Sequence, residues 1–92
     1  MFVWDDANLR HIAEHEVSSD EAEKVILNDP IDLGFEITNG EERFSQVGET
    51  FSGRVLLVVT RWRGDKIRVV TAYPAPKPLR MFYLNQKRGN YG

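Results

Sequence analysis

The stretch Arg54–Tyr73, RVLLVVTRWRGDKIRVVTAY, decides the fold that we expect of this chain. Both halves are dominated by Val, Leu, Ile and Thr, which favour strands, and Gly64-Asp65 lies between them. Such a pair indicates a tight turn, either of two residues or within a four-residue loop from Arg63 to Lys66. The stretch therefore predicts an antiparallel hairpin, in which residues 54–63 form the central strand of a sheet.

Both turn geometries give the hairpin the same register, because pairing begins on either side of the same four residues. The expected cross-strand pairs are Arg61 with Arg68, Trp62 with Ile67, and Val59 with Val70. Side chains alternate between the faces of a strand, so four cations share one face at the turn end of the hairpin. These cations are Arg61, Arg63, Lys66 and Arg68.

Paired arginines need an explanation, because like charges directly opposite each other destabilise a sheet by up to roughly 1 kcal/mol. A phosphate between them would remove the repulsion, and so would carboxylates from elsewhere in the chain. A third arrangement leaves the cations solvated at the rim of the sheet, where charged residues are common. The pattern predicts a phosphate site, with the other two arrangements as alternatives.

The charge of the whole chain is divided between its two halves. Residues 1–53 contain 13 acidic and three basic residues, whereas residues 54–92 contain nine basic residues and the single acid Asp65. The formal net charge of −2 therefore conceals a basic half. A one-sided cluster of Arg and Lys is typical of proteins that meet phosphates or an acidic partner.

Two helices are expected before the strands. Asp5 or Asp6 can cap a helix that runs to about Glu14. Ser18 and Glu21 have the spacing of a capping box and predict a second helix, which ends at Asn28-Asp29-Pro30.

The other segments complete a small α+β domain. Residues 2–4, 31–38 and 42–49 have strand patterns, and Pro78 suits the first turn of a helix over residues 79–86. We expect a single domain over residues 1–86 and a flexible tail over residues 87–92. The domain should hold two N-terminal helices, a curved antiparallel sheet of three or four strands, and a short C-terminal helix.

Composition limits the functions that the chain can have. A length of 92 residues allows one small domain, and the absence of cysteine excludes disulfides, thiolate metal sites and a cysteine nucleophile. The N-terminus lacks the pattern of a signal peptide, and no apolar run reaches membrane-spanning length. We expect a cytoplasmic protein that does not enter a membrane.

Two histidines stand four residues apart on the first predicted helix. His11 and His15 would lie on one helix face, a spacing that suits a metal ion or a proton-transfer pair. The sequence marks no third ligand, and such histidines more often cap or pack a helix. We therefore expect no bound metal.

Arg80 and Tyr83 are three residues apart on the predicted C-terminal helix, so both can point the same way. An arginine beside a phenol is suited to a phosphodiester, because it can stabilise charge while the phenol moves a proton. The alternative is that Tyr83 packs on the sheet while Arg80 extends into solvent.

The order of motifs resembles that of the BrnT toxin family. The resemblance rests on Trp4-Asp5, Asn8, His11-Ile12, His15, Val17, an acidic helix, Glu42-Arg43-Phe44, Gly48, Thr50, Gly53-Arg54, the run from Val55 to Val59, and the run from Ile67 to Ala72. It covers residues 2–83 and depends on the order and spacing of the motifs together.

The resemblance implies a RelE-like domain that acts as a metal-independent endoribonuclease on mRNA, with no cofactor. It implies a partner antitoxin encoded alongside, which we expect to be of the ribbon-helix-helix type. It also implies that the basic strands and the C-terminal helix form the RNA-cutting surface. The residues expected in catalysis are Arg68, Arg80 and Tyr83, and those expected to bind RNA phosphates are Arg61, Arg63, Lys66 and Thr71.

The chain departs from the family pattern at two polar positions. Tyr73 stands where the family usually has Arg, and Leu79 stands where it usually has Glu before the helix arginine. These changes favour an alternative, in which a catalytically degenerate relative serves as a protein- or RNA-binding module. Trp62 and the oppositely charged halves also make a homodimer plausible. DNA binding through a helix is disfavoured, because the first two predicted helices are acidic.

Overall fold

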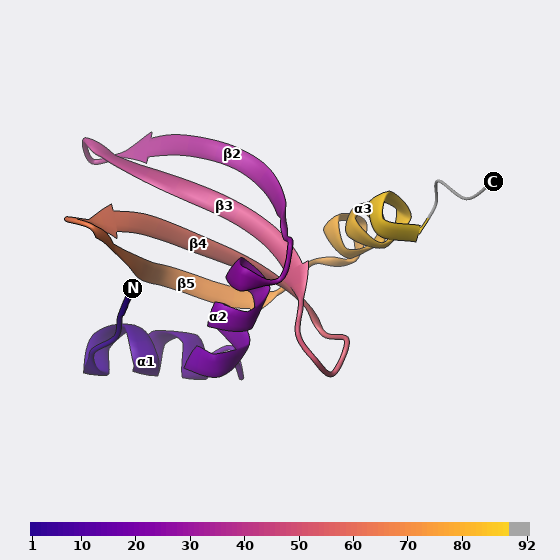
Figure 1. Cartoon of the computed structure of the whole chain (residues 1–92), viewed down its shortest axis with the longest axis horizontal. Coiled ribbons are helices and arrows are strands. Elements are labelled where there is room, and N and C mark those ends of the chain that lie inside the picture. The colour runs from indigo at the N-terminus through magenta and orange to yellow at the C-terminus, as the bar shows by residue number, and fades with distance from the viewer. Residues whose placement is uncertain (89–92) are drawn as a thin grey trace.

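The computed structural model describes residues 1–88 and contains one sheet with helices at two places on it (Figure 1). Along the chain the elements are β1 (Phe2–Val3), α1 (Asp6–Ala13), α2 (Ser19–Leu27), β2 (Ile31–Thr38), β3 (Glu41–Glu49), β4 (Val55–Arg63), β5 (Lys66–Pro74) and α3 (Lys77–Arg88). In Figure 1, α1 and α2 lie together below β5, whereas α3 stands apart at the end where β5 leaves the sheet.

The sheet corrects the expected fold. It has five strands in the order β1-β5-β4-β3-β2, and it is mixed, because β1 runs parallel to β5 while the other pairs are antiparallel. The expectation of three or four antiparallel strands was therefore wrong, although the α+β class and the two N-terminal helices were right. Local sequence patterns do not predict the parallel pair, because β1 has only two residues and two helices lie between it and the other strands along the chain.

The β4–β5 hairpin has the expected register at its turn end and a different one beyond it. Arg61 pairs with Arg68 and Trp62 with Ile67, which confirms the prediction. Val59, however, pairs with Thr71, because the register shifts by one residue between Val59 and Thr60. Such a β-bulge increases the local twist of the strands and is not visible in an alternating sequence pattern.

Helices α1 and α2 bury one face of the sheet. Both begin with a capping box, at Asp5 and at Ser18. Their inner residues form one core with strands β4 and β5, whose members are Ile12, Val17, Ala22, Val25, Leu56, Val58, Val69 and Ala72. The close approach of α2 to β3 requires Gly48, since a Cβ there would lie 3.0 Å from Val25 Cγ1.

Helix α3 forms a second, smaller core at one end of the sheet. Tyr83 is buried there with Val47, Val55 and Ala75, and Leu79 packs against them. The helix has 12 residues and begins before the expected position, because Pro78 occupies its first turn. Of the expected tail, Lys87 and Arg88 belong to α3, and residues 89–92 lie outside the described residues.

None of the helices in residues 1–88 is both long enough and apolar enough to span a membrane.

Candidate functional site

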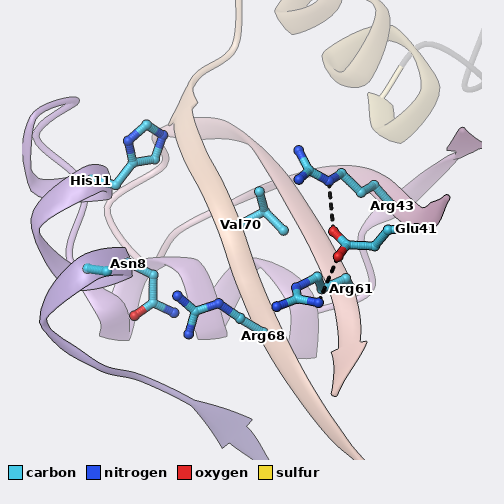
Figure 2. Close-up of a pocket in the computed structure, with 8 residues that line it drawn as sticks. Asn8, His11, Glu41, Arg43, Arg61, Arg68 and Val70 are labelled. Atoms are coloured by element: carbon cyan, nitrogen blue, oxygen red, sulfur yellow. Dashed lines mark hydrogen bonds and ion pairs between the residues drawn. The ribbon is translucent and has the colours of Figure 1, made fainter. Parts of the chain in front are cut away.

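An open hollow lined mostly by polar side chains lies on the sheet face where the paired arginines project (Figure 2). Its volume is about 440 Å³ and it opens widely to solvent. It is lined by Ala7, Asn8 and His11 from α1, Glu41 and Arg43 from β3, Arg61 from β4, and Arg68 and Val70 from β5. We call this hollow the arginine pocket. Figure 2 shows α1 on one side of it and β3 on the other, with β5 between them.

Carboxylates of the same chain hold all three arginines of the pocket. Arg68 Nη1 lies 2.8 Å from Asp5 Oδ2. Glu41 bridges the other two, with Oε1 at 2.8 Å from Arg61 Nη1 and Oε2 at 3.1 Å from Arg43 Nε. These contacts explain how Arg61 and Arg68 can face each other, and they fix the guanidinium groups around the hollow.

Asp5 has two roles at the edge of the pocket. Its side chain accepts a hydrogen bond from the backbone N–H of Asn8 and so caps α1. The Arg68 guanidinium, and then the Asn8 N–H, lower the pKa of Asp5 below its ordinary value of 3.8. Helix α1 and the arginine of β5 are thus tied to the same carboxylate.

Asn8 fixes the position of α1 against the sheet. It is 3% exposed, and its Nδ2 donates to the carbonyl oxygens of Val3 at 3.0 Å and Val69 at 3.2 Å. Its Oδ1 accepts from the backbone N–H of Asp5. One side chain therefore joins β1, α1 and β5, which holds the α1 wall of the pocket in place.

A row of rings continues from the pocket along α1. The ring centroids of His11 and His15 are 5.6 Å apart in an edge-to-face arrangement, and those of His15 and Tyr73 are 5.7 Å apart. Among residues 1–88, no group of three or more His, Asp or Glu side chains is placed to hold a metal ion. His11 is the member of the row that lines the pocket.

The predicted phosphate-binding residues lie on one face but differ in position. Arg61 lines the arginine pocket, and Arg63 and Lys66 are exposed at the tip of the hairpin, where they pair with each other. Thr71 is half-buried, opposite Val59, on the same face as Arg61. The four residues therefore follow the β4–β5 hairpin, with Arg61 beside Arg68 at the pocket.

The predicted catalytic residues are divided between two ends of the sheet. Tyr83 packs against Val55 at the start of β4, whereas Arg61 and Arg68 pair near its end. Six residues of strand separate these positions, which corresponds to roughly 20 Å. The structure thus places Arg68 in the pocket and Arg80 and Tyr83 on α3, at the other end.

The surroundings of Tyr83 differ from those of the pocket. Tyr83 is 2% exposed, and its hydroxyl donates to Glu49 Oε1 at 3.3 Å. Burial, and then the charge of Glu49, raise the pKa of Tyr83 above its ordinary value of 10.0. Arg80, three residues before Tyr83 on the same helix, is exposed.

The sequence did not mark three residues as parts of a site, namely Asp5 at the edge of the pocket and Glu41 and Arg43 in its lining. A signal for the last two existed, since residues two apart on a strand share a face. Their position beside Arg61, however, depends on the pairing of β3 with β4, which the sequence pattern of one strand does not show.

A family model described as "Ribonuclease toxin, BrnT, of type II toxin-antitoxin system" matches residues 4–78. None of the curated proteins matches the chain. The matched range contains every residue of the arginine pocket, and it ends before Arg80 and Tyr83.

Proposed function

This chain belongs to the BrnT family of ribonuclease toxins from type II toxin-antitoxin systems, and on that premise we propose that it cuts single-stranded mRNA at the arginine pocket. The family implies a protein antitoxin as partner. We further propose that this antitoxin is of the ribbon-helix-helix type and that the toxin works in the cytoplasm, where mRNA is translated.

The observation that carries this proposal is the convergence of three arginines on one open hollow. Guanidinium groups bind phosphate through paired N–H donors, and they remain charged at all physiological pH values. The side chains of Arg61 and Arg43 are about one third exposed, at 31% and 32%. A phosphate entering the hollow would thus meet accessible donors that their carboxylate partners already hold in place.

The neighbouring residues support a bound strand of RNA. Arg63 and Lys66 extend the positive face from the pocket to the hairpin tip. Thr71 adds a hydroxyl in the opposite direction along β5, farther from the tip than Arg68. Phosphates on either side of the scissile bond can contact these groups, whereas mRNA bases remain free to be read elsewhere.

The proposed reaction needs no metal ion. The ribose 2′-hydroxyl attacks the adjacent phosphorus, the bond to the 5′-oxygen breaks, and the products carry a 2′,3′-cyclic phosphate and a 5′-hydroxyl. Arg61 and Arg68 stabilise the charge that develops on the phosphoryl oxygens. Proton transfer by Tyr83, with the help of Arg80, stays a prediction of the sequence, and full cleavage by the Tyr83→Phe variant would contradict it.

The purified full-length chain and a single-stranded RNA oligonucleotide, mixed in the presence of EDTA, test the function. We expect cleavage of the RNA but not of the same sequence as DNA, which lacks the attacking hydroxyl. The double variant Arg61→Gln/Arg68→Gln should bind RNA with a weaker salt dependence, its slope smaller by about 0.7 for each phosphate that the protein no longer neutralises.

A matched control is Lys77→Gln, which removes an exposed cation from α3, away from the pocket. It should leave cleavage and the salt slope as they are. Intact RNA under all conditions would contradict the ribonuclease, and an unchanged slope in the double variant would remove the arginines from the binding site.

One observation favours a second candidate, a binding module without catalysis. Each arginine of the pocket already has a carboxylate partner, and the one phenol predicted for catalysis is buried elsewhere. Such a module would bind the RNA oligonucleotide with the same salt dependence and leave it uncut.

Gel filtration of the purified chain tests the homodimer, for which Trp62, 60% exposed, is the candidate contact.

A further inference from the structure

We propose that His11 is the group that accepts the proton from the attacking 2′-hydroxyl, and that His15 is a positioning residue for its ring. This inference rests on the proposed ribonuclease function, to which it adds a catalytic residue. It assigns the proton transfer to α1 in place of α3.

The position of His11 is the first reason. It lines the arginine pocket together with Arg61 and Arg68, and its side chain is exposed on the pocket side of α1 (Figure 2). A group that removes a proton must lie within hydrogen-bond reach of it while the phosphate is held. Of the residues that line this pocket, His11 is the one whose side-chain type exchanges protons near neutral pH.

The second reason is that the backbone after α1 holds His15 at a fixed place beside His11. Val17 N–H donates to the Ile12 carbonyl oxygen at 3.1 Å, and Glu16 N–H donates to that of Ala13 at 2.9 Å. Glu16 has a φ of 59°, so these bonds form a Schellman motif with Glu16 in the left-handed position. The residue before Glu16 is His15, which the motif therefore orients.

Ring contacts extend this support to the sheet. The His15 ring lies edge-to-face with the His11 ring, and it also lies next to the Tyr73 ring of β5. The row ties the His11 ring to the strand that also carries Arg68. This connection fixes the imidazole relative to the arginine, which matters because a misplacement of about 1 Å can cost a reaction 100-fold.

The charged and titratable groups that share either the pocket or the row of rings with His11 come from three strands and from the segment after α1. They are His15 after α1, Arg68 and Tyr73 from β5, Arg61 from β4, and Glu41 and Arg43 from β3. The three arginines are cations, and the one carboxylate, Glu41, bridges Arg43 and Arg61. A phosphate held by these arginines would therefore lie in the same hollow as the His11 imidazole.

Atoms and protons balance in the proposed step. The neutral imidazole of His11 takes the proton of the 2′-hydroxyl as the 2′-oxygen forms its bond to phosphorus. The bond from phosphorus to the 5′-oxygen breaks, the 5′-oxygen takes a proton from solvent, and His11 later returns its proton to solvent. No oxidant, reductant or metal ion takes part.

The test compares matched variants of the full-length chain by single-turnover cleavage of an RNA oligonucleotide across the pH range 5–9. His11→Gln keeps a polar side chain but cannot accept the proton, so cleavage should fall about 100-fold to 10,000-fold and lose its dependence on pH near neutrality. Binding of a 2′-O-methyl oligonucleotide, which cannot react, should stay within about threefold of wild type, since the arginines remain.

The positioning role has its own variants. His15→Ala should lower the cleavage rate about tenfold without weakening binding or lowering the melting temperature, because the His11 ring loses its edge contact. His15→Phe keeps an aromatic ring at that place and should restore most of the rate. Arg10→Gln, a change on the exposed part of the same helix, is the control and should cleave as wild type.

A readout without activity separates this inference from the proposed function. The chain has two histidines, so the His11 imidazole resonance can be assigned by loss in His11→Gln. Adding the 2′-O-methyl oligonucleotide should shift this resonance. If wild type never cuts RNA, the proposed function fails. If wild type cuts and His11→Gln cuts equally well, or if the resonance does not move, the assignment to His11 is wrong.

Discussion

The α1 end and the α3 end of the sheet both hold polar groups suited to phosphodiester chemistry, but in opposite environments. At the α1 end, Arg68 and Arg61 are bound by carboxylates and face an open hollow. At the α3 end, Tyr83 is buried and bonded to Glu49. The comparison shows that residue type alone does not make a site, because a reacting group must also be reachable by the substrate.

The largest effect that we expect is a loss of stability at the α3 end, where Tyr83 has a structural role. Tyr83→Ala should lower the free energy of unfolding by about 3–5 kcal/mol, since it removes a fully buried aromatic side chain. Phe82→Ala is the control, because Phe82 is 42% exposed, and it should cost less than about 1 kcal/mol. Urea unfolding measures both, and equal losses would show that α3 is not anchored through Tyr83.

The next effect concerns catalysis at the α1 end. Arg68→Gln should lower the rate of RNA cleavage about 100-fold to 1,000-fold, as removal of one donor to a developing oxyanion does elsewhere. Arg80→Gln should stay within about threefold, which is the range of a surface charge. A large loss in Arg80→Gln with a small one in Arg68→Gln would reverse the comparison and move the chemistry to α3.

Alkaline pH should act on the α3 end. Because the folded pKa of Tyr83 is raised, the unfolded phenol ionises first, near 10.0. The contribution of the Tyr83 phenol to the free energy of unfolding is therefore fully present below pH 10 and is lost as pH rises through the folded pKa. Tyr83→Phe should lower the free energy of unfolding by about 1 kcal/mol at neutral pH and remove this alkaline loss. An alkaline loss that persists in the variant would assign it to another group.

Acidic pH should act on the α1 end. Because the folded pKa of Asp5 is lowered, its contribution is present above pH 3.8 and is lost as pH falls through the folded value. Asp5→Asn keeps a side chain that can cap α1 but removes the ion pair with Arg68, so its unfolding free energy should depend less on pH below 4. In an Arg68→Gln background, Asp5→Asn should alter this pH dependence little, because the ion pair is already absent. An alteration as large as in the wild-type background would exclude Arg68 as the cause.

The smallest effect tests the turn that positions His15. Glu16→Gly should raise the free energy of unfolding by about 0.5–1 kcal/mol, because glycine adopts the left-handed conformation without the cost that a Cβ imposes. Glu14→Gly is the matched control, since Glu14 has a φ of −61° and should lose about 1 kcal/mol. A destabilised Glu16→Gly would show that this turn carries no backbone strain.

The sequence predicted those features that depend on neighbours along the chain. The two capping boxes, the strand patterns and the pairing of Arg61 with Arg68 follow from side-chain periodicity and turn length. The family also followed from the order of motifs, and the family match bears it out. Each of these structural features depends on interactions within about 20 residues, which local patterns report.

Tertiary structure alone decided the number of strands, the bulge and the composition of the pocket. β1 joins β5 across more than 60 residues, and the same distance separates Asp5 from Arg68. Arg80 and Tyr83 carried a pattern that fits catalysis, yet α3 packs so that Tyr83 enters a core. Which polar groups meet depends on how the sheet and helices close on each other, because burial and partners arise only when distant segments come together.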